Sequence, residues 1–242
     1  MRSVLLFLII VVILVSVCPV FGEEKQFPTN EIKDIKAVEL YPNESMVFID
    51  YAQKVLQKTT DYDWWSTIYH QKLPKFTLTT SASSTLNNSI SYKSANLCDG
   101  KAGTAWVEGA KGNGIGEWVK FHIDASTSFP DAVTNNPFSL DEIGVLPGYA
   151  KSLKTWSENN RVKKLLVVAY SPKLAQNEWV VYRLNLKDEN KLQIFTIPED
   201  KIGYSIQIMK KDIWIKIEDI YKGTKYDDTC ISEFVAVGGF SN

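Results

Sequence analysis

The stretch that decides the fold is DGKAGTAWVEGAKGNGIGEWV, which runs from Asp99 to Val119. Its run Gly112–Gly116 is similar at first sight to a glycine-rich nucleotide-binding loop, but the final glycine of that pattern is missing. The run leads into residues 117–123, where apolar and polar side chains alternate as in a half-buried strand. A phosphate would therefore find no helix N-terminus to bind, and we interpret the run as a tight loop or bulge before a strand.

The same strand signal recurs on the C-terminal side of this stretch. Apolar residues alternate with polar ones over 180–186 and 212–217, and residues 164–170 are apolar on both faces, as in a central strand. Glycine, proline and paired Asn or Asp residues lie between these runs. From Phe76 onward the pattern predicts an all-β domain, residues 76–242, built as a β-sandwich or jelly roll.

The region before Phe76 has a different pattern of apolar residues. After Pro42, apolar residues recur at helical spacing, with Asn43 as N-cap: Met46, Ile49, Ala52, Val55 and Leu56. A second short helix is expected around Trp64, Trp65 and Ile68. Residues 23–75 are therefore predicted to form a helical segment that packs on the β domain or tethers it.

The first 22 residues have the pattern of a secretory signal peptide. Arg2 precedes an apolar run over 4–17, and small residues precede a cleavage position after Gly22. An uncleaved signal anchor is one alternative, because the apolar run nearly reaches the length of a membrane span. A lipid on Cys18 is another, although Val17 is larger than the residue that normally precedes a lipidated cysteine. Export to the cell envelope or the medium is expected.

Composition and motifs exclude several classes of function. The formal net charge of −1 and the scattered Lys and Arg residues provide no basic face for nucleic acid. The two histidines, His70 and His122, lie in no metal-binding or nucleophile motif. Glu108 and Glu117 could in principle form a glycosidase pair, but their spacing does not bring them together, and surface carboxylates explain them better. The chain is not expected to be an enzyme.

Three blocks in order resemble the NADase-type glycan-binding domain of bacterial exported proteins, which has the discoidin-like (coagulation-factor type C) fold. They are Asp99–Val119, Asn159–Val167 following Gly148-Tyr-Ala-Lys and Trp156, and Ile217–Glu233. The resemblance extends over about residues 76–237 and implies a jelly-roll sandwich with a structural calcium ion. Related modules bind that ion through an Asp-Gly loop, a following Ser or Thr and a late Glu. The matching positions here are Asp99, Thr104 and Glu233.

Each of these expectations has an alternative. Asp99-Gly100 could simply form a hairpin turn, and Glu233 could pair with a lysine. Once the signal is removed, Cys98 and Cys230 remain, and an even count in an exported protein suggests a disulfide between them. Two buried thiols are the other reading. A bond between them would join the two segments that carry the expected calcium ligands.

A sugar site needs an aromatic face and polar groups that reach the hydroxyls. The loop from Gly148 to Arg161 offers candidates for both: Tyr149, Lys151, Trp156, Asn160 and Arg161. Alternatively, Trp156 belongs to the core and Arg161 makes an ion pair, just as Trp106 and Trp118 are expected to be buried. The expected function is that of an exported, non-catalytic protein that recognises carbohydrate on a cell or envelope surface. The alternative is a protein-interaction or structural envelope domain without sugar binding.

Overall fold

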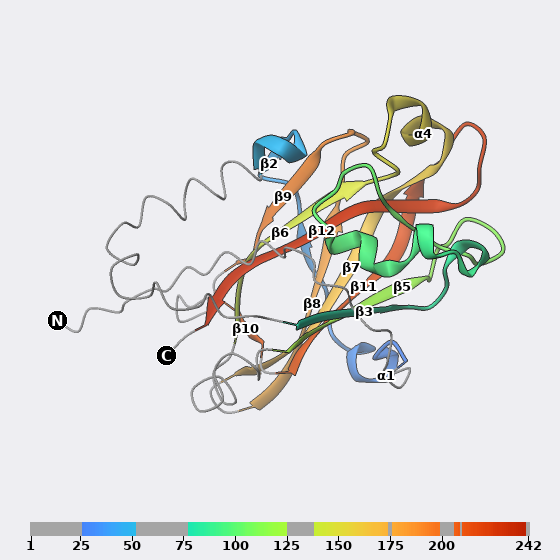
Figure 1. Cartoon of the computed structure of the whole chain (residues 1–242). Helices are drawn as coiled ribbons and strands as arrows, with labels where there is room; N and C mark the ends of the chain where they lie inside the picture. Colours follow the sequence, from blue (N-terminus) through green and yellow to red (C-terminus); the bar gives the residue numbers. More distant parts are fainter. Residues whose placement is uncertain are drawn as a thin grey trace.

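The protein is a curled, two-layered β-sandwich, described here from a computed structural model over residues 26–51, 77–124, 138–173, 176–198, 206–208 and 210–240 (Figure 1). The strands over these residues are β1 (Val38–Leu40), β2 (Glu44–Met46), β3 (Thr77–Ala82), β4 (Trp106–Val107), β5 (Trp118–Asp124), β6 (Phe138–Pro147), β7 (Asn160–Lys173), β8 (Gln176–Asn185), β9 (Leu192–Thr196), β10 (Ile206–Ile208), β11 (Lys210–Tyr221) and β12 (Thr229–Phe240). The helices are α1 (Thr29–Ile32), α4 (Leu153–Glu158) and the 3₁₀ turns η1 (Leu86–Asn88), η2 (Ile90–Tyr92) and η3 (Ser94–Cys98). The predicted all-β sandwich is confirmed.

The described strands form one hydrogen-bonded sheet that folds back on itself. Its main path runs β2-β9-β6-β12-β7-β11-β5-β3, with β8 and β1 continuing from β7. The turning point is the pairing of β12 with β7, which is parallel and involves only Thr229↔Asn160 and Cys230↔Arg161. This short contact joins the two layers and places both chain segments side by side at one end of the sandwich.

The core lies between the two layers and follows the predicted alternation. Ile213, Ile215 and Ile217 of β11 are at most 1% exposed and pack in the same cluster as the inward side chains of β6 and β7. Phe121 of β5 stacks on Phe234 of β12 with ring centroids 4.8 Å apart, which links one layer to the other. Burial of such a set provides most of the driving force for folding, at roughly 25 cal/mol per Å² of apolar surface.

The described part of the segment before the β domain, residues 26–51, is not wholly helical as predicted. Residues 26–51, which we call the N-terminal strap, contain the single turn α1 and a helical turn at 48–51, but also strands β1 and β2. β1 pairs in parallel with β8, and β2 pairs antiparallel with β9. Asn43 is no N-cap: its side chain accepts a hydrogen bond from the Thr196 backbone N–H at 3.0 Å. Pairing with β9 replaces the predicted helix start over residues 44–46, whereas residues 48–51 are helical as the spacing predicts. Residues 52–75, including the expected second helix, lie outside the described residues, as does the predicted signal peptide.

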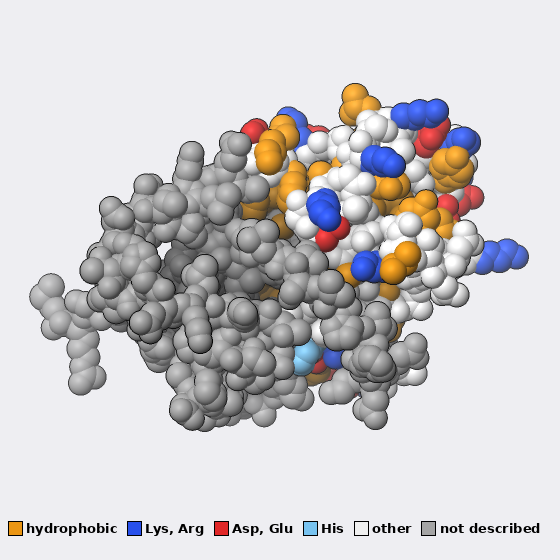
Figure 2. All heavy atoms as spheres, viewed as in Figure 1, with side chains coloured by type: hydrophobic (Ala, Val, Ile, Leu, Met, Phe, Trp, Pro, Cys, Tyr) orange, Lys and Arg blue, Asp and Glu red, His pale blue; other side chains and the backbone are white. Residues whose placement is uncertain are grey.

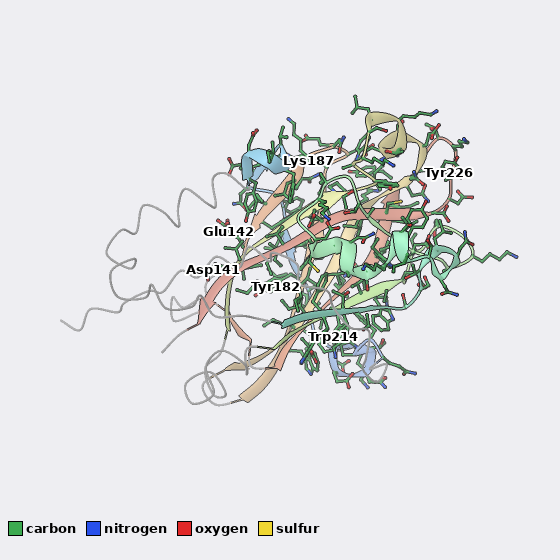
Figure 3. All side chains as sticks on the ribbon, in the orientation of Figure 1. Asp141, Glu142, Tyr182, Lys187, Trp214 and Tyr226 are labelled. Carbon is green, nitrogen blue, oxygen red and sulfur yellow. The ribbon has the colours of Figure 1, made fainter. Side chains whose placement is uncertain are left out.

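The strap also covers an outer face of the sheet. Leu166 and Val168 of β7 and Trp214 of β11 point away from the core and are at most 7% exposed. Phe27 and Ile32 of the strap pack against this outer cluster, and Figure 3 shows Trp214 on the side of the molecule that carries α1. Because the strap covers this outer face of β7, side chains on both faces of the strand are buried here, which explains why residues 164–170 are apolar on both faces. No helix among the described residues is long and apolar enough to cross a membrane.

Five loops gather at the end of the sandwich where β12 meets β7. They are 83–105, 108–117, 148–159, 187–191 and 222–228, and we call this region the loop end. The strand register places them together: Ala82 lies opposite Val119, and Tyr221 opposite Arg161. In Figure 1 this end carries α4 and the 3₁₀ turns.

Candidate functional site

The Asp-Gly loop and the late glutamate do meet in space. Asp99 is followed by Gly100 in a left-handed conformation (φ +71°), and its Oδ1 accepts a hydrogen bond from the Lys101 backbone N–H at 3.0 Å. The Thr104 hydroxyl lies 2.9 Å from both carboxylate oxygens of Asp99. Glu233 extends from β12 against this loop and interacts electrostatically with Asp99. The structure therefore brings together all three residues that the sequence assigned to a calcium site.

Glu233 is the unusual member of this group. It is 1% exposed, and its Oε1 has no hydrogen-bond partner. Burial, and next the charge of Asp99, raise the pKa of Glu233 to about 9, although the backbone N–H groups of Lys101 and Gly100 oppose the shift. A buried carboxyl with an unsatisfied oxygen beside a second carboxyl is costly when ionised, unless a cation compensates it.

The predicted disulfide does not form in the structure. The sulfurs of Cys98 and Cys230 are not bonded to each other, and the two residues contact different clusters. Cys98 packs against the central core and donates to the Ala95 carbonyl at 3.5 Å. Cys230 is completely buried in a smaller cluster at the loop end, where burial raises the pKa of its thiol. The two residues lie in different clusters in this structure, and a disulfide between them stays a prediction.

Of the predicted sugar-site residues, Lys151 is exposed, Tyr149 and Trp156 are half-buried, and Asn160 and Arg161 are buried. Tyr149 is half-buried and meets Tyr92 edge-on, with ring centroids 6.4 Å apart. Burial, and next the neighbouring Tyr92, raise the pKa of Tyr149. Lys151 is exposed two residues further on. Tyr92 was not predicted, because it comes from η2 and no sequence spacing relates it to Tyr149.

Trp156 and Arg161 lie together but do not form an open platform. The Arg161 guanidinium lies 4.6 Å from the centroid of the Trp156 ring, and the Trp156 Nε1 donates to the Pro147 carbonyl at 2.9 Å. Arg161 is 7% exposed and binds both carboxylate oxygens of Asp188, at 3.0 and 2.7 Å. It also donates to the carbonyls of Asn159 and Lys222. This supports the alternative assigned to Arg161 from sequence, an ion pair that holds three loops together.

Asn160 is likewise used inside the protein. Its side chain is fully buried, donates to the Asp227 carbonyl at 2.5 Å and accepts from the Gly223 backbone N–H at 2.7 Å. These bonds tie loop 222–228 to the start of β7. Because its donor and its acceptor are both used, Asn160 positions the loop and does not face a ligand.

The carboxylates of Glu108 and Glu117 also accept hydrogen bonds from other residues of the loop end. Glu108 is buried, and its two oxygens accept the backbone N–H groups of Thr229 (3.1 Å) and Ala110 (2.8 Å). Burial raises its pKa. Glu117 accepts hydrogen bonds from the hydroxyls of Ser83 and Ser84. Both carboxylates therefore fasten loops, which is a structural use that their spacing did not reveal.

The fold and this loop end define the class of an F5/8 type C, or discoidin-like, domain, as the sequence predicted. A family model of the NAD glycohydrolase translocation F5/8 type C domain matches residues 68–237. The chain belongs to this family. No curated protein matches the chain.

Several solved structures are similar in fold. One holds the two CBM32 domains of Clostridium perfringens ZmpB in complex with GalNAc, at 12% identity and a TM-score of 0.43. The match covers 74% of this chain but only 37% of that structure. This chain therefore spans well under half the length of that structure. Another is the F5/8 type C domain of a Bacteroides fragilis protein, at 16% identity and a TM-score of 0.41, covering 68% of this chain and 93% of that one. A third is a Clostridium perfringens CBM32 domain in complex with GalNAc-β-1,3-galactose, at 11% identity and a TM-score of 0.41, covering 66% and 94%.

Proposed function

We propose that this protein is an exported, non-catalytic binding protein that recognises carbohydrate on a cell or envelope surface through its loop end. Family membership supports a binding domain of the F5/8 type C class. The pattern of the first 22 residues supports export. The sugar specificity comes from the loops, because a fold of this kind hosts many functions.

The observation that carries the proposal is the Tyr92–Tyr149 pair. The two rings meet edge to face at 90°, and both pack against the buried cluster of Ala105, Val107 and Cys230. Both tyrosines are only partly buried, and exposed Lys151 follows on the same loop. A partly exposed aromatic ring provides the apolar surface for the C–H face of a sugar, and the ammonium group can bind hydroxyls or acidic substituents.

We further propose that calcium stabilises the loop end through Asp99, Thr104 and Glu233. Calcium takes six to eight oxygen ligands and accepts carboxylates, hydroxyls and carbonyls together. The unsatisfied Oε1 of Glu233 beside Asp99 and Thr104 fits this chemistry. The described residues contain no group of three or more His, Cys, Asp or Glu side chains arranged to hold a metal, so the remaining ligands would be carbonyls or water. The ion would offset the cost of ionising Glu233.

A second candidate, a protein-docking function, is favoured by one observation. The strap carries five exposed large hydrophobic side chains, which are Ile35, Val38, Tyr41, Val47 and Ile49. Exposed apolar surface of this kind is found at sites where another protein binds. The partner in that case would be another envelope protein.

A glycan-array screen of the purified protein, in calcium and in a chelator, tests the carbohydrate proposal. Selective binding should weaken in the Tyr149→Ala variant, because the ring face is lost. Tyr41→Ala is the matched control, since Tyr41 is 68% exposed but lies on the strap. A folded protein that binds no glycan in either buffer would contradict the proposal and leave protein docking as the better account.

A further inference from the structure

Exposed lysines concentrate at the loop end. All five of its loops contribute at least one. The exposed lysines there are Lys93, Lys101, Lys111, Lys151, Lys154, Lys187, Lys191, Lys222 and Lys225. The exposed carboxylates on the same loops are only Asp188, which is bound to Arg161, and Asp227. Figure 2 shows basic side chains spread over the described part of this side of the molecule, and Figure 3 shows that Lys187 and Tyr226 both lie on the side that carries α4.

The other carboxylates of these loops are less exposed: Glu108 is buried, and Asp99, Glu117, Glu158, Glu189 and Asp228 are half-buried. Glu108 accepts two backbone N–H groups, Glu117 accepts two serine hydroxyls, and Asp99 accepts from Thr104 and a backbone N–H. Hydrogen-bonded carboxylates at partial or full burial offer few free lone pairs to a ligand. The fully exposed charges of the loop end are therefore mostly lysines, of which Lys222 lies 3.7 Å from the carboxylate of Asp227, while most of its carboxylates are partly or fully buried.

This separation of charge is local. The N-terminal strap has the opposite composition, with five exposed carboxylates (Glu31, Asp34, Glu39, Glu44 and Asp50) and two exposed lysines (Lys33 and Lys36). Since the whole chain has a formal net charge of −1, the excess of lysines at the loop end is not a reflection of general basicity. A one-sided distribution of this kind steers ligands of the opposite sign toward one face.

An aromatic ring lies within the basic surface. Tyr226 is 41% exposed, and the Lys225 Nζ lies 4.7 Å from its ring centroid. A ring paired with an ammonium group matches a sugar that carries an acidic substituent, because the ring contacts the C–H face while the ammonium binds the anion. On another loop, exposed Lys151 follows Tyr149 by two residues, so an ammonium group and a partly exposed ring are again close in sequence.

We propose that the loop end selects anionic glycans, which carry carboxylate, sulfate or phosphate groups, over neutral ones. This inference rests on the proposed carbohydrate function and specifies its ligand class. Exposed ion pairs contribute little one by one and are screened beyond about 8 Å at physiological ionic strength. When several lysines bind one polyanion, their electrostatic contributions to the affinity sum. The affinity then depends strongly on salt, as it does in protein binding to nucleic acid.

The test compares charged and uncharged forms of the same polymer. Binding of the full-length protein to polygalacturonate and to its methyl ester, and to dextran sulfate and to dextran, is measured from about 0.05 M to about 0.5 M salt. We expect binding to the charged polymers only, with loss of affinity as salt rises. The triple variant Lys151→Gln, Lys154→Gln, Lys225→Gln should bind about tenfold more weakly. The strap variant Lys33→Gln, Lys36→Gln is the matched control and should bind as the unmodified protein does.

Four outcomes would overturn the inference, and they are distinguishable. Equal binding of charged and neutral polymers would remove the charge preference and leave the carbohydrate function intact. A folded protein that binds none of the polymers and no glycan on the array would remove both. Binding to phosphatidylglycerol vesicles, but to no polymer, would assign the basic surface to a membrane. An unchanged affinity in the triple variant would place any anion site elsewhere on the molecule.

Discussion

Replacing Glu233 by glutamine removes the one ionisable group that the structure buries beside the Asp-Gly loop with an unsatisfied oxygen. The unfolded chain releases the Glu233 proton near pH 4.5, whereas the folded chain keeps it until about pH 9, because burial raises its pKa. Between these values the folded state binds more protons than the unfolded state. The free energy of unfolding must therefore fall as pH rises through this interval.

The size of the effect follows from this proton difference. Each pH unit within the interval changes the free energy of unfolding by about 1.4 kcal/mol. Raising the pH from about 6 to about 8 in a chelating buffer should thus cost the unmodified protein roughly 3 kcal/mol, or on the order of 6–12 °C in Tm. Calcium should reverse the loss, because an ion at a hundred times its Kd adds about 2.7 kcal/mol. In Glu233→Gln both the slope from this group and the calcium response should disappear.

Urea unfolding at pH 6, 7 and 8, in calcium and in chelator, measures these terms. The comparison uses the difference between the variant and the unmodified protein, since other groups titrate equally in both. Glu108→Gln is the matched control: Glu108 is also buried and also has a raised pKa, but it accepts backbone N–H groups away from Asp99. Its calcium response should be unchanged. Equal pH slopes in Glu233→Gln and the unmodified protein would refute the reasoning about Glu233, and calcium stabilisation of the variant would refute the metal assignment.

Three further changes test the structural roles at the loop end. Gly148→Ala should lower the unfolding free energy by about 2–3 kcal/mol in urea titration, because Gly148 has φ +79° and a Cβ would lie 2.5 Å from Arg161 Cγ; a loss below about 0.5 kcal/mol would contradict this. Arg161→Met should cost about 3 kcal/mol, because it leaves Asp188 and two carbonyls without their donor, and Arg161→Lys should recover only part of it. Since the sulfurs of Cys98 and Cys230 are not bonded to each other, a reductant should leave the Tm unchanged, whereas a drop of several degrees would reveal a disulfide between them.

The strand content could be predicted because it depends on local alternation. Residues 212–217 alternate between apolar and polar, which indicates a strand buried on one face. Residues 164–170 include apolar side chains at successive positions, which indicates a strand buried on both faces. The glycine-rich run before β5 was also interpreted correctly, since Gly112, Gly114 and Gly116 all have positive φ and lead into a strand. The proposed calcium ligands came from a resemblance rather than a pattern, and the structure places Asp99 against both Thr104 and Glu233.

The partners of each side chain could not be predicted, because they come from distant parts of the chain. Arg161 has the same sequence context whether it faces a sugar or Asp188, and only the packing of loop 187–191 against β7 decides between them. The strap shows the same limit: the spacing places a helix that does begin at Phe48, but nothing in it reveals that residues 38–40 and 44–46 pair with β8 and β9. The sequence by itself therefore determined the class of fold and the residues available at the loop end. The tertiary structure alone decided which of them are buried and bonded and which remain exposed to bind a ligand, because burial and pairing depend on contacts between segments far apart in the sequence.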